Sequence, residues 1–345
     1  MGQGKRTAIM LIAGTILMVA AFFVLILFGA VYIPAGDVFA ALFGKGNATG
    51  FTDTIVLETR LPMAVAAICC GATLSVAGLM MQTLFHNPLA GPSVLGISSG
   101  ASFGVAILVL SAGGLGGVLT GAWQPILTTV AALVGGMATI MVLFLFSAIT
   151  RSGVTLLIVG LMLSYLFSSG IALLNYFSPA DEIRSYLIWG LGSFTGLRLS
   201  SATWLLVLSI LALLPTAFFI KPLNALLMGE RYVESVGYSM NRIRGGVLLT
   251  AGLLVGIPTA FCGPIGFIGL IVPHLCRLLL KSSNHLLLLP ASIIAGGLVG
   301  LLCAFIGVLP SASFGILPVN VITPLIGVPV ILYLLVNRRK LPYFS

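Results

Sequence analysis

The chain has 345 residues and a formal net charge of +9; 59% of its residues are hydrophobic and only 7% are charged. Because about a quarter of the residues in a soluble domain are charged, this composition excludes a soluble protein and predicts an all-α polytopic membrane protein. The positive charge could indicate a nucleic-acid partner, but its distribution along the chain indicates membrane topology instead, so we expect contact with membrane lipid and no nucleic acid.

About ten transmembrane helices are predicted, since each span takes roughly twenty residues. The first, at residues 9–31, follows two basic residues and lacks a signal-peptide cleavage site, so we expect it to be retained. Residues 60–104 predict two helices joined by a tight turn. Seven more are expected at residues 125–149, 155–177, 205–220, 247–262, 266–281, 286–309 and 318–336. They form a single domain, residues 1–345, with no room for a separate ATPase or ligand-binding domain.

Three polar stretches connect the predicted spans. On the outer side, residues 32–59 and 178–200 are each expected to carry a short surface helix. On the other side, residues 221–244 show apolar residues at helical spacing, a break at Gly229 and an end at Gly237, which predicts two short amphipathic helices. Such helices either lie on lipid headgroups or are covered by a partner protein.

The charges are distributed as the positive-inside rule requires if both termini are cytoplasmic. The cytoplasmic side then carries twelve of the sixteen basic residues: Lys5, Arg6, Arg151, Lys221, Arg231, Arg242, Arg244, Arg277, Lys281, Arg338, Arg339 and Lys340. The outer side keeps the other four, Lys45, Arg60, Arg184 and Arg198, with five of the seven acids.

Small residues dominate the two helices at residues 60–104. Gly71, Ser75 and Gly78 lie close to one face of the first, which predicts close packing against another helix. The second begins with serines and glycines, which suits either a wet path or a close helix contact. Serine-bearing helices are therefore candidates to line a translocation path, through Ser98, Ser99, Ser102, Ser164, Ser168, Ser169 and Asn175.

Metal and cofactor sites are not expected. The five cysteines lie in or at the ends of apolar stretches without the paired spacing of a metal site. His274 could be imagined as a haem ligand, but Arg277 follows one turn later, which favours a hydrogen-bonding role at a helix end. No set of histidines points to a metal in the path.

Three motif groups carry a family resemblance over nearly the whole chain. The first comprises Arg60-Leu61-Pro62, Gly71-Ala72, Gln82, Asn87 to Pro92, Leu95-Gly96 and Ser99-Gly100-Ala101. The second runs from Gly263 to His274 with Arg277, and the third comprises Leu317-Pro318-Val319, Ile322-Thr323, Leu325-Ile326-Gly327, Pro329 and the basic tail. Together they resemble the FecCD family, the permease subunits of ATP-binding-cassette (ABC) importers for iron-siderophore complexes, haem and cobalamin.

The resemblance implies a type II ABC importer permease fold in the cell inner membrane. Such a chain is not an enzyme and holds no cofactor, because ATP and Mg²⁺ are bound by a separate ATPase. The implied partners are two ATPase subunits, a second permease copy and a substrate-binding protein.

The resemblance also implies roles for particular residues. Contact with the ATPase is implied for Gly229, Glu230, Arg231, Glu234, Ser235, Gly237 and Arg242, and a cytoplasmic gate for Thr150, Ser152 and Thr155. Arg60 is expected at the outer surface, either as an interfacial anchor or facing carboxylates of the binding protein, together with Arg184 and Arg198.

The chain departs from the family pattern at Met63, Phe305, Ile316 and Asn320, so the cargo and the outer surface stay open. Two other classes of membrane protein have requirements that can be checked in the sequence. An ion-coupled secondary transporter of a small hydrophobic solute would need an ionisable group within a span. An intramembrane enzyme would need a catalytic group at depth, and the predicted spans offer neither.

Overall fold

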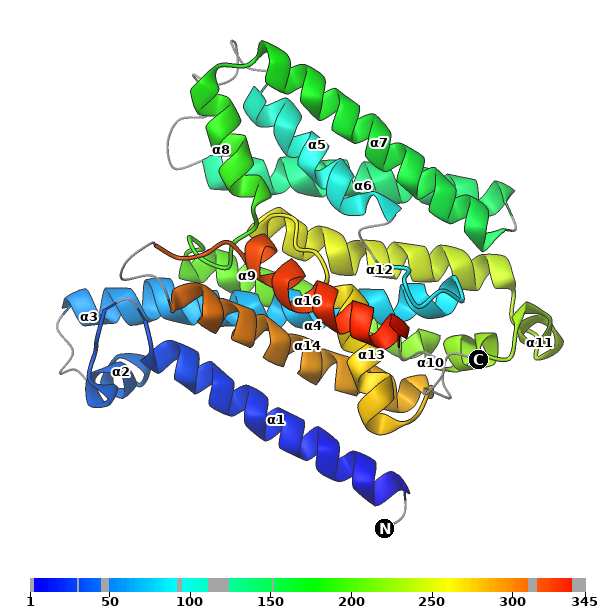
Figure 1. The fold of residues 1–345 in the computed structure, drawn as a ribbon, viewed down its shortest axis with the longest axis horizontal. Helices are drawn as coiled ribbons and strands as arrows, with labels where there is room; N and C mark the ends of the chain where they lie inside the picture. The colour runs from blue at the N-terminus through cyan, green and yellow to red at the C-terminus, as the bar shows by residue number, and fades with distance from the viewer. Residues whose placement is uncertain are drawn as a thin grey trace.

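The computed structural model describes residues 3–29, 31–44, 50–91, 95–110, 124–150, 152–309 and 315–336. Every regular element in these ranges is a helix (Figure 1). In chain order they are α1 (Gln3–Leu27), α2 (Ala35–Leu42), α3 (Gly50–Ile55), the π-helical η1 (Val56–Arg60), α4 (Leu61–Leu84), α5 (Ile97–Leu110), α6 (Gln124–Ile149), α7 (Gly153–Phe177), α8 (Ala180–Gly190), α9 (Leu199–Leu213), the 3₁₀-helical η3 (Leu214–Phe219), α10 (Ile220–Leu226), α11 (Glu230–Ser235), α12 (Met240–Cys262), α13 (Ile268–Leu280), α14 (His285–Val308) and α16 (Val319–Val336). Arg151 and the basic tail from Arg338 to Lys340 lie outside the described residues.

The prediction of an all-helical membrane protein is confirmed. Seven helical segments in the described part are long and apolar enough to cross a membrane: 7–27, 50–84, 124–149, 153–177, 199–226, 240–262 and 285–308. Three shorter apolar helices, α5, α13 and α16, occupy the other positions where spans are predicted. The short helices predicted in residues 32–59 and 178–200 are also present, as α2 and α8.

Helix α4 lies at the centre of the bundle and is buried along almost its whole length, between α14, α12, α13 and α9 (Figure 1). Its small residues permit this. A β-carbon at Gly71 would overlap the carbonyl group of Gly296 in α14, and one at Gly78 would overlap that of Gly269 in α13. Between them, the Ser75 hydroxyl donates a hydrogen bond to a carbonyl oxygen of α14 at 2.7 Å. The predicted packing role of this helix is confirmed.

Several predicted boundaries differ from the structure; for example, the span expected from residue 205 begins at Leu199. The helix expected to begin at Arg60 begins at Gly50, because α3, η1 and α4 form one continuous run with a π-helical turn ahead of Pro62. The helix expected from residue 247 begins at Met240, because the buried Ile243 and Val247 extend its apolar face toward the N-terminus. Two basic residues assigned to the preceding loop, Arg242 and Arg244, therefore belong to helix α12.

The two ends of the bundle carry different short helices. Helices α2 and α3 lie at one end, and α10 and α11 lie at the other (Figure 1). Helix α1 begins and α16 ends on the side of α10 and α11 (Figure 1). The two ends of the described chain thus share one side.

Candidate coupling and gate region

The short helix α11 forms the middle of the segment predicted to contact an ATPase. Gly229 precedes it at φ +102° and Gly237 follows it at φ +89°, a backbone region that favours glycine. Within α11, the side chain of Val233 is buried, while those of Arg231 and Glu234 are exposed. The prediction of two short helices separated at a glycine is confirmed by α10 and α11. The predicted coupling residues lie on α11, at its ends or at the start of α12: Gly229, Glu230, Arg231, Glu234, Ser235, Gly237 and Arg242.

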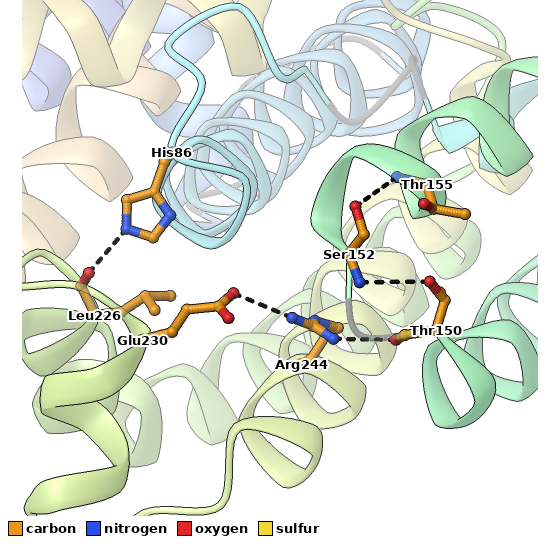
Figure 2. Close-up of polar contacts among 7 residues, drawn as sticks. All are labelled: His86, Thr150, Ser152, Thr155, Leu226, Glu230 and Arg244. Carbon is orange, nitrogen blue, oxygen red and sulfur yellow. Dashed lines mark hydrogen bonds and ion pairs between the residues drawn. The ribbon is translucent and has the colours of Figure 1, made fainter.

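Arg244, on the second turn of α12, connects two segments that are distant in sequence. Its side chain is 2% exposed. One guanidinium nitrogen, Nη2, lies 3.1 Å from Oε1 of Glu230, and the other, Nη1, donates to the carbonyl oxygen of Thr150 at 3.1 Å (Figure 2). A planar guanidinium can hold two acceptors in fixed directions, which an ammonium group cannot do.

Helix α10 is also held in place by polar contacts with residues at the ends of α4 and α14. The Asn224 carbonyl oxygen, Oδ1, lies 2.8 Å from Nδ1 of His285 and accepts the His285 backbone N–H at 2.8 Å. The other ring nitrogen of His285 lies 2.8 Å from the Thr83 hydroxyl at the end of α4. His86 Nε2, just beyond α4, lies 2.9 Å from the carbonyl oxygen of Leu226 (Figure 2). Helix α10, which begins the segment predicted to contact an ATPase, is therefore attached to α4 and α14.

The predicted gate residues lie where α6 ends and α7 begins. Thr150 and Ser152 lie between the two helices, in what is called here the gate turn, and Thr155 lies in the first turn of α7. The backbone N–H of Ser152 lies 3.4 Å from the Thr150 hydroxyl, and the Ser152 hydroxyl accepts the N–H of Thr155 at 3.3 Å (Figure 2). This last bond is an N-cap, which satisfies one of the free N–H groups at the start of α7. Both Ser152 and Thr155 are exposed. The structure thus places this turn beside the coupling helix, with Arg244 between them.

The predicted path serines have different surroundings. A β-carbon at Gly96, before α5, would lie 2.8 Å from the Gly160 carbonyl oxygen and 2.8 Å from the Ser164 hydroxyl, so Ser164 sits at a close contact between α5 and α7. Ser168, one turn later, is exposed. Three more serines lie partly exposed on α5: Ser98, Ser99 and Ser102. Their place in a path stays a prediction.

Arg60 does not occupy the exposed position expected for it. Its side chain is 3% exposed, and its guanidinium donates to the carbonyl oxygens of Ile26 at 2.8 Å and Leu27 at 3.0 Å, and to that of Val31. Ile26 and Leu27 are the last two residues of α1 and Val31 lies four residues beyond it, so Arg60, at the end of η1, connects to the end of α1 and the segment that follows. Arg184 and Arg198 are exposed, and their docking role stays a prediction.

Asn320, recognised in the sequence only as a departure from the family pattern, connects three segments of the fold. Its side-chain oxygen accepts the Gly266 N–H at 3.1 Å, and its amide nitrogen donates to the Pro264 carbonyl at 2.6 Å and to the Gly190 carbonyl at 3.4 Å. The end of α8, the loop before α13 and the start of α16 are joined by this one side chain. The other departures are apolar: Met63 is buried, Phe305 packs edge-on against Phe28, and Ile316 is exposed.

Replacing Asn320 with leucine is expected to lower the thermal stability of the purified protein. Leucine keeps the approximate size but leaves a half-buried N–H and carbonyl without their partner, which costs about 1–3 kcal/mol. Thermal unfolding in detergent measures the effect. The control is Asn241→Leu on the exposed side of α12; equal unfolding temperatures for the two variants would show that Asn320 does not hold the junction.

His274 makes a polar contact with Arg277, one turn later on α13. Its Nδ1 is 3.3 Å from Nη1 of Arg277, which also bonds the side-chain oxygen of Gln82 in α4. The amide nitrogen of Gln82 donates to the Leu270 carbonyl at 3.1 Å. The hydrogen-bonding role expected for His274 is confirmed, but its expected place at a helix end is wrong, because His274 lies in the middle of α13. Within the described residues, no group of three or more His, Cys, Asp or Glu side chains is arranged to hold a metal ion.

The chain is similar to known transport proteins over nearly its whole length. The FecCD transport family model matches residues 16–337. The vitamin B12 import system permease protein BtuC of Citrobacter koseri is 33% identical over 343 residues, 98% of this chain and 97% of the relative. The BtuC protein of Klebsiella pneumoniae is 34% identical over 342 residues, 98% of this chain and 96% of the relative.

Solved structures agree with this similarity. An inward-facing conformation of a metal-chelate type ABC transporter superposes with a TM-score of 0.81 at 27% identity, over 95% of this chain and 99% of that chain. A second structure, PsaBC from Streptococcus pneumoniae, gives a TM-score of 0.51 at 15% identity, over 86% of this chain and 94% of that chain, and shows a likeness of fold alone.

Proposed function

Because this chain belongs to the FecCD transport family and is an ABC importer permease, we propose that it carries cobalamin from a binding protein to the cytoplasm. The observation that carries this choice of cargo is the similarity to vitamin B12 permeases over 98% of the chain. Iron-siderophore complexes and haem are the other cargoes that the motifs imply. Permeases of this kind are not enzymes themselves, and ATP hydrolysis is assigned to a separate ATPase chain that binds ATP and Mg²⁺.

The proposed topology has ten spans in the cell inner membrane, with both termini in the cytoplasm. The seven long segments would be joined by the shorter α5, α13 and α16. Helix α1 begins and α16 ends on the same side as α11 (Figure 1), which supports this orientation. The excess of basic residues assigned to that side also supports it.

The proposed assembly contains two copies of this chain, two ATPase subunits and a binding protein. The exposed side chains of α11, including Arg231 and Glu234, would meet the ATPase. The outer end, with Arg184 and Arg198, would meet the binding protein. A second copy is placed against α7, where large apolar side chains such as Tyr165, Leu166 and Leu173 are exposed. ATP-driven closure of the ATPases would then draw the two α11 helices together and move the attached spans as rigid bodies.

Reconstituted transport tests the proposal. The chain is expressed with its cognate ATPase and binding protein and placed in proteoliposomes, and uptake of labelled cobalamin, a ferric siderophore and haem is compared. We expect ATP-dependent uptake of cobalamin and no ATP hydrolysis by the chain alone. Preferred uptake of another chelate would overturn the cargo, and uptake driven by an ion gradient without ATP would favour the secondary-transporter alternative.

Cysteines introduced at Ser152 or Thr155 are expected to cross-link between two copies, and the cross-link should block uptake. Both positions are exposed at the start of α7, and the native cysteines Cys69, Cys70, Cys262, Cys276 and Cys303 are all buried. Cross-linked dimer on a denaturing gel is the measurement. Ser200→Cys, exposed at the start of α9, is the control. No cross-link at either gate position in any nucleotide state would place the dimer contact elsewhere.

A further inference from the structure

The bridge made by Arg244 contains an ion pair with Glu230, and it lies between the coupling helix and the gate turn. Taking a cation out of water is costly unless it is paired and hydrogen-bonded. Here both conditions hold. Glu230 supplies the negative charge, and the Thr150 carbonyl follows the last turn of α6, where the negative end of the helix dipole lies.

The position of α11 allows this bridge to transmit motion. A helix of six residues with a glycine of positive φ on each side can pivot as a unit. Its main-chain connections run to α10 and α12 only, so motion at its exposed face reaches α6 and α7 through contacts. Among the described residues, the Arg244 guanidinium is the polar group that touches both α11 and the turn at Thr150 (Figure 2).

We propose that Arg244 is a positioning residue that makes α11 and the gate turn move together, so that displacement of α11 by the ATPase is transmitted to Thr150 and Ser152. This inference rests on the proposed importer function. It also separates the two acids of α11. Glu230, 49% exposed, directs its carboxylate to Arg244, whereas Glu234, one turn later, is exposed toward the side a partner would occupy.

The test compares Arg244→Lys and Glu230→Gln with the controls Asn241→Gln, at an exposed position of the same helix turn, and Glu234→Gln. Lysine keeps the charge but cannot hold two acceptors in the guanidinium geometry, and glutamine keeps the shape of Glu230 without its charge. Each variant is assembled with the ATPase and binding protein in proteoliposomes. In the two bridge variants we expect ATP hydrolysis to continue while cargo transported per ATP falls roughly tenfold, the size of a typical coupling between sites. The control Asn241→Gln should keep the wild-type ratio, and Glu234→Gln should alter assembly without altering that ratio.

A distance measurement gives a readout that a merely structural role would not move. Spin labels are attached at Ser152→Cys and Val236→Cys of one chain, both exposed positions, with the second copy unlabelled. In the otherwise wild-type complex we expect one narrow distance distribution with and without ATP. In Arg244→Lys and Glu230→Gln the distribution should shift with nucleotide, because α11 then moves without the turn.

The outcomes separate this inference from the proposed function. If the wild-type complex does not form or does not transport, the importer assignment itself fails. If it transports and both bridge variants keep the wild-type ratio and the narrow distribution, Arg244 does not transmit motion. Loss of assembly in Arg244→Lys together with full coupling in Glu230→Gln would also overturn the inference, since the arginine would then only support the fold.

Discussion

The Gly78→Ala variant is expected to yield little folded protein, although it adds a single methyl group. The α-carbon of Gly78 faces the backbone of α13, and a β-carbon there would overlap the carbonyl group of Gly269. Backbone atoms cannot rotate away as a flexible side chain can, so α4 and α13 would have to separate. Overpacking of a close contact costs about 1–3 kcal/mol, and a contact between two backbones belongs at the upper end of that range.

Gly256→Ala in α12 is the matched control. Gly256 is also buried in a helix, but a β-carbon there would meet no atom within 4 Å. The same change should therefore be neutral, or stabilise the helix by up to about 1 kcal/mol. The yield of monodisperse protein and its unfolding temperature in detergent measure both variants. Similar values for the two would show that α4 and α13 are not in backbone contact.

The central role of α4 could be predicted from sequence because small residues at helical spacing mark close helix packing in lipid. Short helices in polar stretches were also predictable, since apolar residues at helical spacing and glycine breaks are local signals. These signals located α10 and α11, whereas the gate turn was implied by the family resemblance. They did not show that the segments meet, because that contact joins residues 94 positions apart, Thr150 and Arg244.

Two residues that join distant segments, Arg244 and Asn320, escaped prediction for physical reasons. Arg244 was counted as one more cytoplasmic charge, and a sequence does not show whether an arginine is buried against an acid or exposed. The one local signal was its place beside Ile243 in an apolar repeat that extends α12 to Met240. Asn320 was visible only as a departure from a family pattern, because its three partners come from distant parts of the chain.

The Arg60→Met variant is expected to lower stability by roughly 3 kcal/mol, since several charge-assisted hydrogen bonds to backbone carbonyls are lost together. Methionine is similar in length but donates no hydrogen bond, so the carbonyl oxygens of Ile26, Leu27 and Val31 would lose their donor at the end of α1. Arg60→Lys should be intermediate, because one ammonium group cannot replace the full set of guanidinium contacts. Unfolding temperature and the proteolytic release of α1 are the measurements.

The docking hypothesis for Arg60 makes the opposite prediction, which decides between the two roles. If Arg60 faces a binding protein, Arg60→Met should keep the stability of the wild type and weaken docking in a way that salt masks. If it instead holds α1, stability should fall and any change in docking should not depend on salt. Arg184→Met, at an exposed position of α8, is the matched control: it should leave the unfolding temperature within about 0.5 kcal/mol of wild type, as surface substitutions do. Unchanged stability in Arg60→Met together with salt-dependent loss of docking would return Arg60 to the outer surface, and its contacts to α1 would then have to open in the assembled importer.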